Sequence, residues 1–222
     1  MPPFFRILFY TLLGLALIAA GWEVAARLID SPTRLPAMLV VVNKAVTLAQ
    51  TAEYIRHATE SATALLYGLL PAVIGGILLG MMADASAGIR FLVAPLAVTL
   101  GAAPLVALLP MFVAWWGLTL AMKAGLVGVA AGFPVMNAVM VAAGEKSRTV
   151  ATLHGMRLGV VLGVSALVIT EFVAGSRGVG FVIMSSASMF DTVTTLAGTV
   201  LVAVPTIAVA ALLQAIEAQV GD

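Results

Sequence analysis

The chain has 222 residues, of which 62% are hydrophobic and 9% charged, and its mean hydropathy is +1.15. A soluble domain carries about a quarter charged residues, so this composition excludes an ordinary soluble protein. The 11 basic and 10 acidic residues nearly balance, which gives no reason to expect nucleic acid as a partner. The lack of cysteine excludes disulfides, thiolate metal sites and a cysteine nucleophile.

Successive apolar stretches predict an all-α fold, a polytopic transmembrane helical bundle in a single domain over residues 1–222. A helix needs roughly 20 mostly apolar residues to cross a bilayer. Six stretches meet this length: about 4–27, 59–82, 91–116, 119–143, 152–174 and 192–216. The first is too long for a signal peptide and no small-residue cleavage site follows it, so we expect it to be a retained span.

The polar segments between these stretches are short, except for residues 27–60. Within that segment, residues 37–50 repeat apolar side chains at helical spacing, which predicts an amphipathic helix on the periplasmic membrane surface. An even number of spans places both termini on one side. The charge bias does not orient the bundle, because five Lys and Arg residues fall on one side and six on the other.

The second stretch carries a small residue at every fourth position. These residues are Gly68, Ala72, Gly76 and Gly80. The spacing places them on one helix face, where small side chains let another helix approach closely. We expect a packing seam there, with the lining of a pore as the alternative.

The third and fourth stretches contain residues that break helices. They are Pro95, Pro104 and Pro110, followed by Trp115 and Trp116, and then Pro134 near Asn137. Each proline strands a carbonyl group, and broken helices in lipid are tolerated where they are buried or line a polar cavity. The pattern fits either a pathway lining or simple kinks with an interfacial aromatic anchor.

Glu171 is the only acid well inside an apolar stretch, about one turn before Gly175. Charged groups in spans usually face a bundle interior or water, so Glu171 is either functional or a structural hydrogen-bonding group. At the other end of the same stretch, His154 and Arg157 are expected to reach the headgroups. His57 and His154 lie far apart in sequence and neither has a second ligand at metal spacing.

Catalytic motifs are missing from the sequence: it has no H-E-x-x-H, no G-x-S-x-G and no phosphate-binding loop. The glycines of residues 175–180 follow an apolar stretch and are interpreted as an exit turn. We therefore expect neither an enzyme nor a cofactor bound by this chain. Uphill transport would draw its energy from an ion gradient or from another subunit.

Several short motifs follow one another in a recognisable order. They are Trp22-Glu23, Leu35-Pro36, the block 103–110, Trp115-Trp116-Gly117 and Gly178-Val179-Gly180-Phe181. Their order and spacing resemble the membrane (permease) subunit of type I ABC importers, in the branch of nitrate, sulfonate, taurine and pyrimidine-precursor permeases. The resemblance covers nearly the whole chain, from about residue 22 to about residue 213.

The resemblance implies a permease subunit that moves a small organic solute across the bacterial inner membrane, with its N-terminus inside. Its partners would be an ABC ATPase that binds the ATP, a periplasmic solute-binding protein, and a second copy or a paralogous permease. The residues expected to lie near the translocation pathway are Pro104, Pro110, Trp115, Trp116, Asn137 and Glu171. The solute itself is not specified by the sequence.

This chain departs from the family pattern between the fourth and fifth stretches. Family members carry there the EAA motif, a helix that docks into the ATPase, whereas here only residues 144–151 separate the stretches and are predicted to form a polar hairpin turn. By comparison with the family pattern, roughly two dozen residues are missing, although both flanking stretches remain long enough to cross a bilayer. Glu145, Lys146 and Arg148 would be the remaining contacts for the ATPase.

Two alternatives to a working importer follow from this departure. One is an uncoupled or degenerate permease that lacks ATPase docking and pairs with an intact paralogue. The other is a secondary transporter driven by an ion gradient, with Glu171 as the protonatable group.

Overall fold

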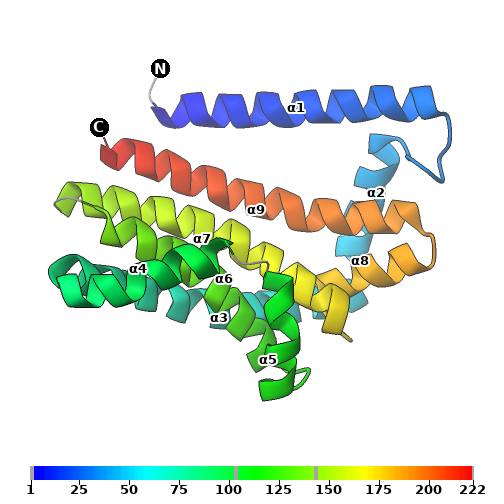
Figure 1. Cartoon of the computed structure of the whole chain (residues 1–222). Coiled ribbons are helices and arrows are strands. Elements are labelled where there is room, and N and C mark those ends of the chain that lie inside the picture. The colour runs from blue at the N-terminus through cyan, green and yellow to red at the C-terminus, as the bar shows by residue number, and fades with distance from the viewer. Residues whose placement is uncertain (1–2, 103–104, 143–144, 222) are drawn as a thin grey trace.

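The computed structural model describes residues 3–102, 105–142 and 145–221, and most of them are helical (Figure 1). The elements are α1 (Pro3–Ile29), α2 (Met38–Ala49), α3 (Ala52–Ala85), α4 (Ala87–Ala102), the 3-10 helix η1 (Leu105–Leu108), α5 (Leu109–Trp116), α6 (Leu120–Met140), α7 (Glu145–Ala174), α8 (Val179–Ser188) and α9 (Thr192–Gly221). Within these described ranges there is no β-strand. The predicted all-α fold is confirmed.

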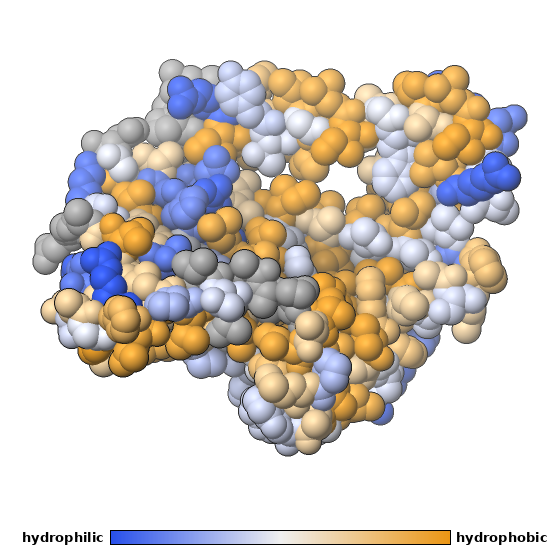
Figure 2. Space-filling model, in the orientation of Figure 1, coloured by the Kyte–Doolittle hydropathy of each residue, from blue (hydrophilic) through white to orange (hydrophobic). Residues whose placement is uncertain are grey.

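The long helices run in broadly the same direction, and both termini lie at the same end of the molecule (Figure 1). Five of them, α1, α3, α6, α7 and α9, are long and apolar enough to cross a membrane. Hydrophobic side chains cover much of the face shown in Figure 2, and hydrophilic ones gather toward the ends of the long helices. This distribution is that of a multi-pass membrane protein.

Five of the six predicted stretches coincide with one long helix each, but two of these helices begin earlier than expected. Helix α3 begins at Ala52, where the Thr51 hydroxyl accepts a hydrogen bond from the Tyr54 N–H at 3.2 Å, an N-cap. Helix α7 begins at Glu145. The predicted hairpin turn over residues 144–151 is therefore wrong from Glu145 onward, because these residues form the first turns of α7.

The third predicted stretch, residues 91–116, is not one helix. The chain passes through α4, η1 and α5 instead, and Pro110 lies in the first turn of α5, where a missing N–H does no harm. The start of α4 lies beside the end of α6, since Arg90 Nη2 donates to the Met140 carbonyl at 3.0 Å. The broken segment thus leads the chain from that end of α6 to its beginning at Leu120.

Helix α6 packs between α3 and α7 and contains several fully buried side chains, among them Met122, Leu126 and Val139. The small residues of α3 lie against it. A Cβ added to Gly76 would lie 2.8 Å from the Gly132 carbonyl oxygen, and one added to Gly80 would lie 2.7 Å from the Val139 Cβ. The two backbones approach closely because these positions have no side chain.

Helix α1 lies at the edge of the bundle, and its end is joined to the start of α2. The Trp22 indole N–H donates to the Pro36 carbonyl at 2.9 Å, and a carboxylate oxygen of Glu23 accepts from the Met38 N–H at 3.1 Å. The motifs Trp22-Glu23 and Leu35-Pro36 thus meet at one corner. The predicted helix over residues 37–50 is α2, which packs on α9 through Val41. Its position relative to a membrane surface stays a prediction.

Candidate functional site

Three of the buried polar side chains among the described residues, Ser61, Lys123 and Glu171, form a cluster near the end of α7. Glu171 is fully buried, and both of its oxygens are engaged. The Ser61 hydroxyl lies 2.7 Å from Oε1 and 2.9 Å from Oε2, and the Gly180 N–H donates to Oε2 at 2.9 Å. Each partner of Glu171 donates a hydrogen bond to it, which is the arrangement that an ionised carboxylate requires.

Lys123 supplies the charge that matches Glu171. Its side chain is 7% exposed, and its Nζ lies 3.2 Å from Glu171 Oε1 and 3.5 Å from Glu60 Oε1. The same Nζ donates to the Arg177 carbonyl at 2.8 Å. The ammonium group thus donates two hydrogen bonds and has a second carboxylate within ion-pair distance, with these oxygens on three segments of the chain.

The cluster also caps the N-terminus of α8. The first N–H groups of a helix have no partner inside the helix, and here side chains of other helices accept from them. His57 Nδ1 accepts from the Gly178 N–H at 3.0 Å, Ser61 Oγ accepts from the Val179 N–H at 2.8 Å, and Glu171 accepts from Gly180. A carboxylate at this position is favoured by the helix dipole.

Two glycines let α8 approach Glu171. Gly178 has a φ of +120°, a conformation that residues with a Cβ rarely adopt, and a Cβ there would lie against the Glu171 carboxylate. A Cβ on Gly180 would lie 2.8 Å from the Val168 carbonyl oxygen. The glycines interpreted from sequence as an exit turn therefore form the close contact between the N-terminus of α8 and Glu171, which we call the seat of α8. Together these contacts tie α3, α6, α7 and α8 into one unit.

Sequence reasoning singled out Glu171 but missed its partners. Lys123 is one of the eleven cations of the charge bias, but it lies in the first turn of α6 and is buried. His57 precedes the predicted second stretch, which starts at residue 59, and Ser61 lies in the first turn of that stretch. The signal that could have found Lys123 is the cost of Glu171 itself, because a buried carboxylate needs a cation.

Of the residues predicted to line a pathway, Glu171 lies at the centre of this cluster and the others do not contact it. Trp115 and Trp116 are 61% and 45% exposed at the end of α5, with Phe112 packed against both rings. Asn137 is exposed and lies 14 residues after Lys123 in α6, about 21 Å along the helix axis. Pro104 lies outside the described residues. Whether any of these lines a pathway stays a prediction.

The residues predicted to face an ATPase lie at the start of α7, at the end of the molecule that carries the termini. Lys146 is exposed, but Arg148 Nη2 is bound to Asp84 Oδ2 at 2.8 Å, an ion pair that joins α7 to the end of α3. Glu145 is the first residue of α7, and only its backbone is described. Only residues 141–144 separate α6 from α7, so the connection is shorter than the eight residues expected.

At the same end, Arg157 and His154 do not simply extend toward headgroups. Arg157 Nε lies 3.3 Å from Glu217 Oε2, and His154 Nδ1 lies 3.2 Å from Glu217 Oε1. These contacts join α7 to α9. Among the described residues, no group of three His, Cys, Asp or Glu side chains could hold a metal ion.

This fold and this cluster define a multi-pass α-helical membrane protein whose bundle is fastened by buried charge. Two relatives specify the class further. The chain is 28% identical to the taurine transport system permease protein TauC of Escherichia coli (strain K12), over 85% of this chain and 79% of the relative. It is 23% identical to the formylaminopyrimidine transport permease protein ThiX of Halalkalibacterium halodurans, over 77% and 78%.

These similarities confirm the resemblance to transport permeases that the sequence motifs indicated. No family model matches the chain.

Proposed function

We propose that this chain is the permease subunit of an ABC-type importer for a small organic solute in a bacterial inner membrane. The observation that supports this function is its similarity, over most of its length, to two transport permeases named for taurine and formylaminopyrimidine. Its partners would be an ATPase that binds ATP, a periplasmic solute-binding protein, and a second permease subunit. The substrate class would be small and zwitterionic or heterocyclic, like the solutes of the relatives.

In such an importer the Lys123–Glu171 cluster would hold α6, α7 and α8 together, so that the three helices move as one unit. Coupling needs an element that transmits two discrete arrangements from one site to another. A rigid unit that reaches from the α8 end to the α6–α7 connection is suited to this task. Only the connection over residues 141–144 and the first turn of α7 would meet the ATPase.

The short connection favours a second candidate function, an uncoupled permease that pairs with an intact paralogue. A helix of eight residues extends about 12 Å, and residues 141–144 leave no room for one that projects away from the bundle. The ion-driven alternative has less support, because Glu171 is enclosed and all its contacts are donors.

Co-purification with the ATPase encoded beside this chain tests the proposal. Stable stoichiometric association of the tagged, unmodified chain supports a working importer, and ATP-dependent solute uptake in liposomes containing the binding protein would complete the test. Association only after a family coupling loop replaces residues 141–144 supports the uncoupled permease. Solute flux without any ATPase, lost in Glu171→Gln, would overturn both in favour of the ion-driven transporter.

A further inference from the structure

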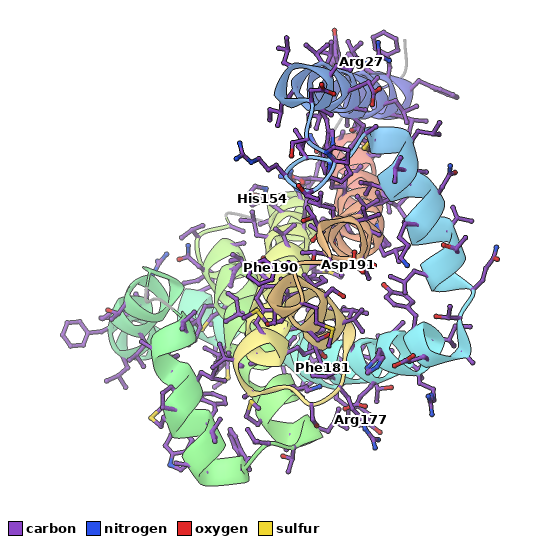
Figure 3. All side chains as sticks on the ribbon, turned by 90° about the vertical axis from the view of Figure 1, so that its right-hand side faces the viewer. Arg27, His154, Arg177, Phe181, Phe190 and Asp191 are labelled. Atoms are coloured by element: carbon purple, nitrogen blue, oxygen red, sulfur yellow. The ribbon has the colours of Figure 1, made fainter. Side chains whose placement is uncertain are left out.

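A small pocket lies next to the cluster, between the corner that joins α2 to α3 and the outer side of α8. Its volume is about 180 Å³, and its polar lining comes from Thr51, Glu53, Tyr54, His57, Ser185 and Ser186. It lies at the end of the bundle opposite the termini, the end that Figure 3 faces, where Phe181 of α8 lies close to the start of α3. The Phe181 and His57 ring centroids are 5.8 Å apart.

Tyr54 gives the pocket an unused hydrogen-bonding group. Its side chain lines the pocket and the residue is only 7% exposed. Among the described residues, its backbone N–H bonds to Thr51, but no group bonds to its hydroxyl. The hydroxyl is not among the fully enclosed, unpartnered polar atoms of the described residues, so it can be reached from the pocket, and a group bound there would find a donor and an acceptor.

The charge of the lining residues indicates that the bound group is positively charged. Glu53 is the charged residue that lines the pocket, it forms no ion pair with a described residue, and no lysine or arginine is among the described lining residues. His57 does not add a positive charge, because a ring nitrogen that accepts the Gly178 N–H carries no proton. An anion would therefore meet one carboxylate and no cation.

The aromatic rings point to the same choice. Tyr54 and Phe181 both line the pocket, and the face of an aromatic ring attracts a cation within about 6 Å. A carboxylate, two aromatic rings and hydroxyl oxygens that can accept hydrogen bonds are groups that bind an ammonium ion. The volume equals that of about six water molecules in the liquid, which admits a compact amine of a few heavy atoms.

We propose that this pocket binds the ammonium group of a small amine. Two sources of that chemistry are available at a membrane surface: a free solute, and the headgroup of phosphatidylethanolamine. The inference does not rest on the proposed transport function, since binding can be measured with the purified chain alone. His57 joins the pocket to the Gly178 N–H at the seat of α8, so occupancy would also stabilise the α3–α8 contact.

Ethanolamine is the probe, and the full chain in detergent is the sample. Saturation-transfer NMR and calorimetry should show ethanolamine binding, while ethylene glycol, which lacks the ammonium, and isethionate, which is anionic, should not bind. Tyr54→Phe and Glu53→Gln should each weaken ethanolamine binding about tenfold, the effect of one lost hydrogen bond to a charged group. Tyr67→Phe is the matched control, because Tyr67 lies on α3 but is 65% exposed elsewhere.

Glu53 is exposed, so Glu53→Gln should fold even if Tyr54→Phe does not. The same titration in lipid nanodiscs distinguishes the two sources. Loss of ethanolamine binding in phosphatidylethanolamine discs, with retention in phosphatidylglycerol discs, identifies the lipid headgroup; retention in both identifies a free amine. The proposal is overturned if ethanolamine does not bind in detergent, if isethionate binds as well as ethanolamine, or if neither variant weakens binding.

Discussion

Lys123 and Glu171 depend on each other at the level of single residues. Taking either charge out of water is expensive, and the partner compensates for much of that penalty. Lys123 is 7% exposed and Glu171 is fully buried, so solvent screens their attraction little. Removing one partner therefore does more harm than removing both.

Lys123→Met should lower the free energy of unfolding by about 3–5 kcal/mol, because it leaves Glu171 buried beside Glu60 without a cation. The double variant Lys123→Met/Glu171→Leu should recover part of that loss, since no uncompensated charge remains in the cluster. Thermal unfolding in detergent, followed by tryptophan fluorescence, measures both.

Lys146→Met is the control for the loss of a lysine, because Lys146 is exposed and its replacement should change the free energy of unfolding by less than about 1 kcal/mol. A double variant that loses as much stability as the two single variants added together would contradict the coupling of Lys123 with Glu171.

Gly178 permits a second prediction at this scale. Gly178→Ala combines an unfavourable φ of +120° with contact between the new Cβ and the Glu171 carboxylate. Gly117 has a φ of +64° and open space around it. Gly117→Ala therefore measures the loss of stability from backbone strain alone. We expect both variants to lose about 1–3 kcal/mol from backbone strain, and Gly178→Ala to lose more than Gly117→Ala. Equal apparent melting temperatures would argue against a tight seat for α8.

At the scale of helices, the seam between α3 and α6 is the most closely packed contact in the described part of the chain. Gly75 and Gly76 are neighbours in α3 with opposite surroundings. A Cβ on Gly76 would meet the Gly132 carbonyl oxygen at 2.8 Å, whereas a Cβ on Gly75 would meet nothing within 4 Å. Replacing each glycine by alanine therefore separates two effects on stability: both replacements raise helix propensity, but only the one at Gly76 disturbs packing.

Gly76→Ala should destabilise the bundle by about 1–3 kcal/mol, the usual effect of overpacking. Gly75→Ala should be neutral or stabilising by up to about 1 kcal/mol, because alanine reduces the conformational freedom of the unfolded chain. Their apparent melting temperatures in the same detergent should therefore move in opposite directions or differ clearly. If Gly76→Ala unfolds no earlier than Gly75→Ala, the α3–α6 approach is looser than the structure indicates.

The helices themselves could largely be predicted from sequence, because a membrane requires long apolar stretches and those are easy to recognise. The broken helix over residues 91–116 could not, since proline allows a kink as readily as a break. The early start of α7 could not be predicted either. Residues 145–148 are polar, and polarity marks where a stretch leaves the lipid, which need not be where the helix begins. The pairing of Lys123 with Glu171 joins positions 48 residues apart and leaves no local pattern.

At the scale of the whole molecule, the number of passes determines which ends face the same compartment. Both termini lie at one end, together with the α6–α7 connection, while α8 and the start of α9 lie at the other. Although the third predicted span is broken, the chain still travels the length of the bundle between α3 and α6. The two ends should therefore face opposite compartments.

The lack of cysteine makes this topology testable without background labelling. Lys146→Cys marks the end that carries the termini, and Met189→Cys, at a residue that is 78% exposed, marks the end near α8. With the N-terminus inside, a membrane-impermeant maleimide should label Met189→Cys in intact cells with an opened outer membrane, and Lys146→Cys only after lysis. The reverse pattern would mean either that the orientation is inverted or that the broken segment, which precedes both positions, does not carry the chain across the bilayer. Labelling of both positions from outside would mean that α7, the long helix between them, does not cross.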